Sequence, residues 1–300
     1  MKKLFAFLLA LFVLTLSACK QENLSYNEKI QFPKIAQESH GEIPFNFELG
    51  SKKEIIGKEL SLYKVTPRRD EKNAENYDSF LFEVFEVSID KSVKNEHFTK
   101  YFCNDGGTLE IYNSGSFIFS HNRKKQKIVE LSDNEIITIA EKFLRDNALL
   151  PEGFTVGKVL GGTYNGKGEP LKKTVGFYHE IDGCEVYGRS DIIVEVDSLG
   201  INAIYSIYSE YEFEQKIKCL TYDEILDISP LKEGQIVYDS TKLSSAGEYV
   251  IFEDVEIMYY DSPVNQPKLT YIQPVYKFIG KIYDIDGHST DYYWIIQAIS

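Results

Sequence analysis

The fold is decided first by Ser132-Asp133-Asn134-Glu135, a stretch with the pattern of a helix capping box. In such a box the Ser side chain accepts a hydrogen bond from the third amide of a helix, and the Glu side chain accepts one from the Ser amide. Apolar residues then recur at helical spacing, at Ile136, Ile139, Ala140 and Phe143. The sequence therefore predicts an amphipathic helix that starts after Ser132 and ends before Pro151.

Segments of strand length follow this helix, and Asp182-Gly183 and Leu199-Gly200 supply tight turns between them. We expect strands over 154–163, 174–181, 185–196 and 201–213.

The same order recurs further along the chain. Thr221-Tyr222-Asp223-Glu224 is a second capping box, and strand-like segments follow at 249–260, 268–280 and 290–299. The turn Ile285-Asp286-Gly287 repeats Ile181-Asp182-Gly183. The recurrence indicates a duplicated helix-then-strand unit, and the alternative is a chance recurrence of common turn signals.

One motif within the first unit resembles a known family. Residues 177–188 read Phe-Tyr-His-Glu-Ile-Asp-Gly-Cys-Glu-Val-Tyr-Gly, and Ile192–Val196 and Gly200 follow. This is similar to the Asp/Asn-Gly and Val-x-Val pattern of PepSY-like modules, which also occur in YycH/YycI-type regulatory proteins on the outer face of Gram-positive membranes. Gln273–Gly280 is similar to the closing segment of the same lipoprotein group. The resemblance implies helix-on-antiparallel-sheet modules that bind or restrain another protein, and it implies no catalytic residue.

The region before the first capping box is rich in strand signals. Leu109–Tyr112 and Phe117–Phe119 flank a turn and predict a hairpin, and Ser61–Val65 alternates as a strand does. Ser79–Ile89 is apolar on two sides, which favours a strand covered on both faces. The predicted fold class is thus α+β, with a strand-rich region at 48–128 and two PepSY-like units at 129–218 and 219–300.

The N-terminus carries an export signal. Lys2 and Lys3 precede the apolar run 4–16, which is shorter than the ~20 residues of a membrane-spanning helix. Leu16-Ser17-Ala18-Cys19 then resembles a bacterial lipobox, which implies cleavage between Ala18 and Cys19 and acyl chains such as palmitate on Cys19. We expect a signal peptide at 1–18, a lipidated tether at 19–47, and a location on the extracytoplasmic face of the cell membrane. An ordinary signal peptide that contains a Cys is the alternative.

Charge and cysteine content limit the possible partners. The formal charge is −13, and removal of residues 1–18 takes away two bases and no acid, so that the mature charge is −15. Such a chain is repelled by phosphates, which argues against nucleic acid as a partner.

Cys103, Cys184 and Cys219 remain after lipidation of Cys19. Cys184 and Cys219 either form a disulfide or are buried thiols. The basic run 121–127 could contact anionic lipid or wall polymer, or could be a solvated linker.

The search for catalytic and metal-binding motifs finds each template incomplete. The glycine-rich loop 161–168 has no Ser or Thr after its Lys, and His179-Glu180 begins an HExxH motif in which Gly183 replaces the second His. Asp284, Asp286, His288 and Asp291 lack the spacing of an EF-hand, and a turn with solvated acids is the expected alternative. Acidic residues at 253, 254 and 256 fit the wet face of a strand. We therefore predict no catalytic residue, no metal and no cofactor.

Aromatic residues of the predicted strands are the remaining candidate for a binding surface. Tyr and Trp are common at the centre of protein interfaces, and packing across neighbouring strands is the alternative. The candidate residues are Tyr205, Tyr208, Tyr211, Tyr292, Tyr293 and Trp294. The leading hypothesis is a non-catalytic lipoprotein that binds and modulates another envelope protein. The alternatives are a lipoprotein that binds a small ligand or glycan, and an envelope hydrolase whose residues are brought together by folding.

Overall fold

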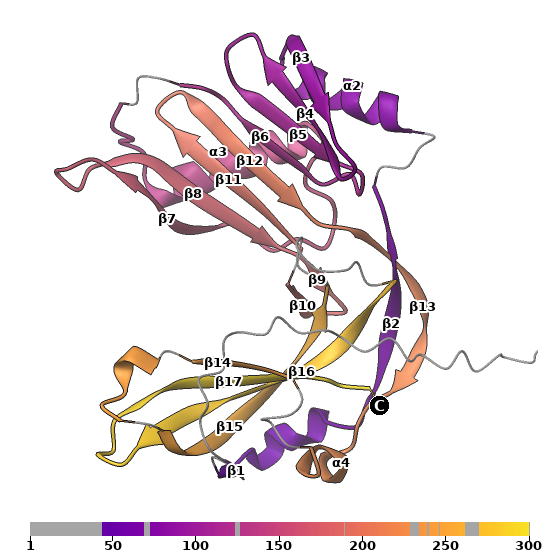
Figure 1. The fold of residues 1–300 in the computed structure, drawn as a ribbon, viewed down its shortest axis with the longest axis vertical. Helices are drawn as coiled ribbons and strands as arrows, with labels where there is room; N and C mark the ends of the chain where they lie inside the picture. Colours follow the sequence, from indigo (N-terminus) through magenta and orange to yellow (C-terminus); the bar gives the residue numbers. More distant parts are fainter. Residues whose placement is uncertain are drawn as a thin grey trace, which may run out of the picture. The chain divides into compact units, whose positions relative to one another are not determined.

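The structure is a computed structural model that describes residues 44–68, 73–123, 127–188, 190–228, 234–238, 240–245, 247–261 and 270–299. These residues are mostly β, with an antiparallel sheet, a curled mixed sheet and few helices (Figure 1). The predicted signal peptide, the cleavage site at Ala18 and Cys19, and most of the tether lie outside the described residues. Among the described helices, none has the length and hydropathy of a membrane span.

The first sheet has eight antiparallel strands. Their bounds are β3 Ile89–Lys94, β4 Phe98–Cys103, β5 Thr108–Tyr112, β6 Phe117–Ser120, β7 Lys158–Tyr164, β8 Pro170–Tyr178, β11 Asp191–Asp197 and β12 Gly200–Ile207. The order across the sheet is β3-β4-β5-β6-β12-β11-β8-β7. The predicted hairpin around residue 115 is confirmed as β5 and β6. Strands from the expected N-terminal region and from the first expected unit share this sheet, because β6 pairs with β12.

The predicted capping-box helix is confirmed as α3 (Asp133–Asp146). The Ser132 amide donates to Glu135 Oε2 at 2.8 Å, and the Glu135 amide donates to Ser132 Oγ at 3.4 Å. Ile136, Ala140 and Leu144 lie on one face of the helix and are buried against β7, β8, β11 and β12. Each large apolar side chain buried in this way contributes about 1.5–3 kcal/mol.

The prediction of a strand at 79–89 is wrong. Most of this segment belongs to the helix α2 (Ala74–Val84), which packs on the same face of the sheet as α3. Its apolar residues Tyr77, Leu81 and Phe85 are four apart, which is the spacing of one helix face. The apparent two-sided strand pattern arises because Phe80 and Phe82 flank this face. Phe85 stacks on Phe119 of β6 with ring centroids 3.9 Å apart, which fixes the end of the helix on the sheet.

The second sheet has nine strands and is mixed. Its strands are β1 Phe45–Phe47, β2 Glu59–Thr66, β9 Glu180–Ile181, β10 Cys184–Tyr187, β13 Glu210–Lys218, β14 Gln235–Tyr238, β15 Gly247–Tyr260, β16 Tyr271–Asp284 and β17 Ser289–Gln297. The main path is β13-β2-β16-β15-β10-β9, and β1 and β10 both run parallel to β15. The sheet therefore includes strands from well before residue 219.

The second capping box forms as predicted, but the helix that it begins is much shorter than α3. Thr221 and Glu224 make both reciprocal hydrogen bonds, and α4 spans only Tyr222–Leu226. The short 3₁₀ helices η1 (Gly50–Ile55) and η2 (Ser240–Lys242) complete the described helices. Ile225 of α4 packs into an aromatic core beneath the nine-stranded sheet, together with Phe252, Phe278 and Trp294.

Three predicted strands are each divided between the sheets, and the first of them, 174–181, becomes β8 and β9. The predicted strand 185–196 becomes β10 and β11, and 201–213 becomes β12 and β13. Between β10 and β11, Gly188 has φ +107°, and a Cβ there would lie 2.1 Å from the carbonyl oxygen of Asp261. Only glycine fits this close approach, which lets the chain leave one sheet and enter the other.

The three described cysteines are free thiols, so Cys184 and Cys219 do not form a disulfide. Cys103 and Cys219 are buried, and burial raises the pKa of each thiol to about 11. Cys184 is only half-buried, although burial and the nearby Asp182 also raise its pKa.

We predict that Cys184 is alkylated first in the folded protein. A thiol reacts as its thiolate, so the raised pKa and the burial of Cys103 and Cys219 should make both react with iodoacetamide at pH 7.5 much more slowly than Cys184. Mass spectrometry of peptides after timed alkylation, with a urea-unfolded sample as control, gives the rate for each cysteine separately. Labelling of Cys103 or Cys219 at the unfolded rate under native conditions would contradict the buried positions.

Candidate functional site

The structure separates the six aromatic residues that the sequence suggested as one binding surface. Tyr292 and Trp294 are buried in the core of the nine-stranded sheet, where Trp294 stacks on Phe278 with ring centroids 5.2 Å apart. Tyr208 is buried in the core of the eight-stranded sheet. These three rings pack inside the protein, which agrees with the alternative that the aromatic residues pack across neighbouring strands.

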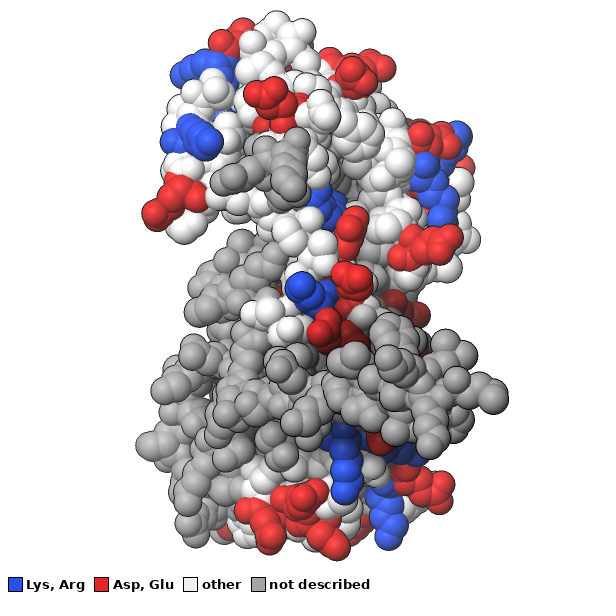
Figure 2. Space-filling view, turned by 90° about the vertical axis from the view of Figure 1, so that its right-hand side faces the viewer, with Lys and Arg blue, Asp and Glu red and all other residues white. Residues whose placement is uncertain are grey.

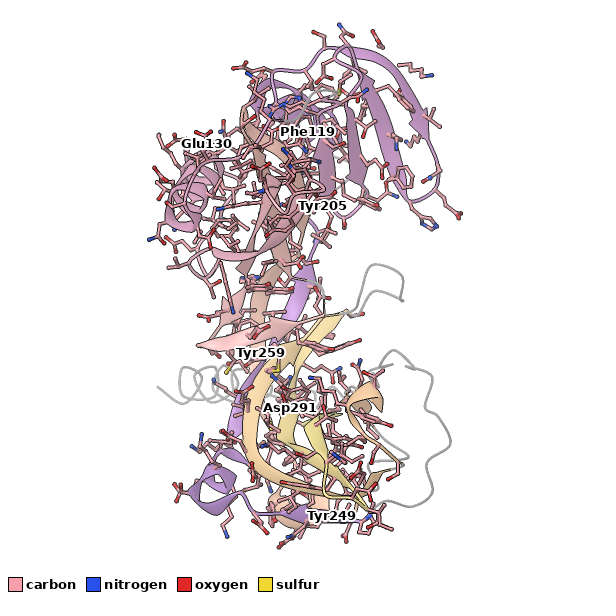
Figure 3. The ribbon with its side chains drawn as sticks, turned by 90° about the vertical axis from the view of Figure 1, so that its left-hand side faces the viewer. Phe119, Glu130, Tyr205, Tyr249, Tyr259 and Asp291 are labelled. Carbon is pink, nitrogen blue, oxygen red and sulfur yellow. The ribbon has the colours of Figure 1, made fainter. Side chains whose placement is uncertain are left out.

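The other three aromatic residues are half-buried but lie on different strands. Tyr205 belongs to β12, Tyr211 to β13 and Tyr293 to β17. Figure 3 labels Tyr205 on the eight-stranded sheet and Tyr259 and Tyr249 on the nine-stranded one. Of the six candidates, Tyr205 is therefore the one that lies half-buried on the eight-stranded sheet.

Tyr208 has a structural role beside Arg68. The Arg68 guanidinium carbon lies 3.7 Å from the centroid of the Tyr208 ring, and Nη2 donates to the carbonyl oxygen of Gly115 at 2.5 Å. Arg68 follows β2, a strand of the nine-stranded sheet, whereas Gly115 lies in the β5–β6 turn. This cation–π contact thus ties the end of β2 to the eight-stranded sheet.

The two faces of the eight-stranded sheet differ in what covers them. Phe119, Ile204 and Val194 are cross-strand neighbours that are fully buried beneath α2 and α3. The residues next to these in sequence are Ile118, Tyr205 and Ile193. They are also direct neighbours in register, but they are only half-buried. Because successive side chains of a strand point to opposite faces, these three lie on the face away from the helices. We call Ile118, Ile193 and Tyr205 the apolar face.

Ion pairs flank the apolar face on the same side of the sheet. Lys100 Nζ lies 2.5 Å from Glu110 Oε1, and Glu110 is the register neighbour of Ile118. Lys172 Nζ lies 3.0 Å from Glu195 Oε2, two residues along β11 from Ile193. Such part-exposed pairs add little stability, but they surround an apolar centre with polar groups.

One edge of this sheet is apolar and exposed. β7 pairs with β8 alone among the described strands. Val156, Leu160 and Tyr164, just before and within β7, have 45 to 78% of their surface exposed. A Cβ on Gly176 would touch Leu160, which places Leu160 on the same face of the sheet as Gly176 and its register neighbour Ile193. The exposed edge therefore continues the apolar face.

Two residues of the basic run 121–127, His121 and Arg123, form ion pairs. His121 Nδ1 lies 2.8 Å from Asp105 Oδ2, and Arg123 Nη1 lies 2.6 Å from Asp197 Oδ1. Residues 124–126 lie outside the described part. On the side of the molecule shown in Figure 2, acidic and basic side chains are interspersed over the described surface.

A Ser–His pair is present, but its environment does not suit catalysis. His179 Nδ1 lies 3.0 Å from Ser190 Oγ, and Tyr211 Oη lies 3.1 Å from Ser190 Oγ and 2.8 Å from Asp261 Oδ2. In a hydrolase triad the carboxylate orients the His, whereas here Asp261 accepts from a Tyr. Ser190 is only 4% exposed, which blocks substrate from its oxygen. Burial lowers the pKa of His179 to about 4, and Phe154 and Tyr211 stack on its ring.

Three of the four acidic-turn residues are brought together. Ligand atoms of Asp284, Asp286 and His288 lie within 4.8 Å of one another, while Asp291 lies on β17 outside this group. Asp284 already accepts four hydrogen bonds, from the amide and hydroxyl of Ser244 and from the amides of Asp286 and His288. Burial raises the pKa of Asp284, but these hydrogen bonds outweigh burial and hold the pKa well below its usual range. The arrangement is that of a hydrogen-bonded turn.

The remaining sequence motifs also have structural roles. The glycine-rich loop 161–168 spans the end of β7 and the β7–β8 turn, where Asn165 bonds to Glu169. Two members of the acidic group at 253–256 are paired: Asp254 with Lys52 at 3.1 Å and Glu256 with Lys277 at 3.2 Å.

We predict that His179 makes the protein sensitive to mild acid. Its pKa is lower in the folded state than the ~6.5 of an unfolded chain, so the stability it contributes is full above pH 6.5 and is lost as the pH falls toward 4. The loss should reach up to about 3 kcal/mol. Urea unfolding of wild type and His179→Gln at pH 7.5 and pH 4.5 measures it. The wild type should lose more stability on acidification than the variant, and an equal loss would contradict the assignment.

Comparisons with known proteins found no relative of this chain. No protein-family model, no curated protein and no solved structure matches this chain.

Proposed function

We propose that this chain is a lipid-anchored lipoprotein of the extracytoplasmic face of the cell membrane, and that it binds and modulates another envelope protein without catalysing a reaction. The anchor in this proposal is the lipid on Cys19, after cleavage between Ala18 and Cys19. Two or more acyl chains bind a membrane firmly, whereas one binds weakly. The acidic charge of the body fits a tethered protein that is held off an anionic bilayer surface.

The apolar face is the observation that carries the proposal. Ile118, Ile193 and Tyr205 are in register across three central strands, on the side of the sheet that α2 and α3 leave uncovered. An apolar centre with a rim of ion pairs is the usual anatomy of a protein interface. Tyr205 contributes a large rigid ring of the kind that often dominates binding energy.

The β7 edge supports the same role by a second route. A partner strand that added beside β7 would form main-chain hydrogen bonds, and its alternate side chains would meet Leu160 and Tyr164. This mode of binding needs no diagnostic side-chain motif.

The PepSY-like relationship is part of the proposal. The antiparallel strands β8, β11 and β12 beneath α3 support it for the first unit. Support for the second unit is weaker, because α4 has five residues and its sheet recruits β1, β2 and β13. The burial of Ser190 beside His179 supports a role in binding over a hydrolase.

The lipid anchor gives a direct prediction. Cys19→Ser removes the sulfur that carries the acyl chains, so the variant should move from the membrane fraction to the soluble fraction. Immunoblots of fractionated cells measure this, with Cys184→Ser as the matched control that keeps Cys19. Membrane retention of Cys19→Ser at the wild-type level would refute the anchor.

The apolar face gives a second prediction. Tyr205→Lys places a charge at its centre and should reduce recovery of the cross-linked partner from intact membranes at least tenfold, which corresponds to about 1.4 kcal/mol. Tyr249→Lys, at an exposed position on the nine-stranded sheet, is the matched control and should leave recovery unchanged. Thermal melting of both variants checks the fold. Equal recovery with Tyr205→Lys and wild type would exclude the apolar face as the binding surface.

A further inference from the structure

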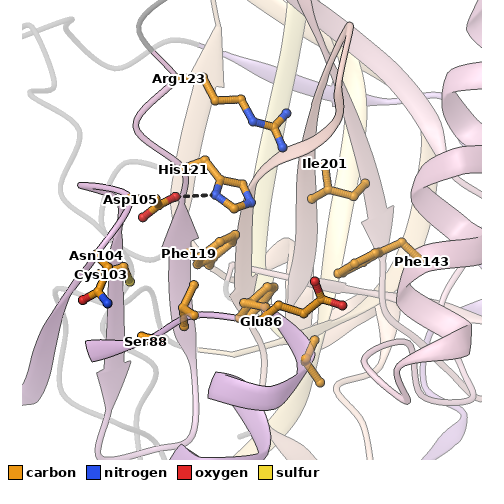
Figure 4. Close-up of a pocket in the computed structure, with 13 residues that line it drawn as sticks. Glu86, Ser88, Cys103, Asn104, Asp105, Phe119, His121, Arg123, Phe143 and Ile201 are labelled. Carbon is orange, nitrogen blue, oxygen red and sulfur yellow. Dashed lines mark hydrogen bonds and ion pairs between the residues drawn. The ribbon is translucent and has the colours of Figure 1, made fainter. Parts of the chain in front are cut away.

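A cavity of about 520 Å³ lies on the helix-covered side of the eight-stranded sheet, where α2, β4 and β6 end (Figure 4). This volume is typical of sites for small ligands. Its apolar wall includes Val84 and Phe85 at the end of α2, Phe119 of β6, Phe143 of α3 and Ile201 of β12. The cavity is separate from the apolar face, which lies on the other side of the sheet.

The wall of the cavity is aromatic. Phe85 stacks on Phe119 with centroids 3.9 Å apart, and the Phe143 ring lies nearly parallel to Phe85 at 6.3 Å. The His121 ring meets Phe119 edge-on at 4.7 Å. Faces of aromatic rings are electron-rich and attract cations. Phe85 and Phe119 are almost fully buried, so the partly buried ring of Phe143 has the most surface left for a ligand.

Polar groups also line the cavity, and all but one of its charged side chains have partners. Asp105 and His121 are paired with each other, and Arg123 is paired with the buried carboxylate of Asp197. Glu86 is exposed, its side chain has no hydrogen bond or ion pair within the described residues, and its carboxylate points toward Phe143 in Figure 4. The charge that is left for a ligand is therefore negative.

The backbone of Glu86 is held in an unfavourable conformation. Its φ is +51°, the left-handed region that a helix commonly uses just after its last turn and that glycine adopts at least cost. The amide of Val87 donates to the carbonyl oxygen of Phe82 at 3.1 Å, which completes this helix end. The chain thus places a long carboxylate where glycine would be the more stable choice, and strain of this kind is often found at binding sites.

We propose that this cavity binds a small organic cation, an amine whose ammonium group pairs with Glu86 and whose apolar body lies against Phe85, Phe119 and Phe143. An anion would meet the unpaired carboxylate of Glu86, and the guanidinium of Arg123 is already neutralised by Asp197. The net charge of −13 also favours the approach of a cation. The inference stands apart from the proposed protein partner, since it uses a different side of the sheet.

Three probes of similar size test the charge preference. Benzylamine is a cation at neutral pH, benzyl alcohol is neutral and benzoate is an anion. Chemical-shift titration of the full chain should give saturable binding of benzylamine in the millimolar range expected for a fragment of this size, and at least tenfold weaker binding of the other two. Equal or tighter binding of benzoate would overturn the proposal.

Variants of Glu86 locate the site. Glu86→Gln keeps the shape and removes the charge, and should weaken benzylamine binding at least tenfold. Glu86→Gly removes the carboxylate and relieves the backbone, so it should melt no lower than wild type and lose binding equally. Glu83→Gln, an exposed position on α2 outside the cavity, is the matched control for net charge. Unchanged binding by Glu86→Gln, or an equal loss with Glu83→Gln, would refute the assignment.

Discussion

The alternation of side chains along a strand is the constraint on which this structure depends. In the eight-stranded sheet, one set of side chains faces α2 and α3 and is fully buried, and the next residue along each strand faces away from them. Two helices cover one face of an eight-stranded sheet, and the described part of the chain has no helix for the other face. The apolar face and the cavity therefore have the same cause, which is that two helices cover only part of the sheet. The apolar face lies on the side without helices, and the cavity lies where α2 ends on the other side.

The nine-stranded sheet uses its aromatic residues differently. Phe252, Phe278 and Trp294 pack ring against ring beneath the sheet, and Phe45 and Phe47 of β1 join them from the start of the described chain. Each aromatic side chain buries a large area. A short strand that carries two of them can therefore pair stably with a strand that is distant in the sequence. This explains how β1 comes to lie parallel to β15, about two hundred residues further along.

Several groups that resemble functional sites are satisfied within the fold. Asp284 is fully used by the amides and hydroxyl of its own turn and of Ser244, and His179 is uncharged at neutral pH and stacked between two rings. Buried polar groups are normally paired, because an unpaired one costs free energy. Glu86 differs from both groups because it is exposed to solvent. Its side chain has no partner in the described residues, and its backbone has a positive φ beside a cavity.

The sequence alone determined the local elements of this protein. The capping boxes at Ser132 and Thr221, the β5–β6 hairpin and most strands follow from side chains close together in the chain. The prediction of a strand at 79–89 failed because a short apolar run, Phe80, Leu81 and Phe82, fits both periods, and only the sheet beneath it selects the helix. Tertiary structure alone decided that β10 and β11, or β12 and β13, belong to different sheets. It also decided that Tyr205 is half-buried while Trp294 is fully buried, and that Glu86 and Phe143 line one cavity. These outcomes depend on contacts between residues far apart in the sequence, which local patterns do not encode.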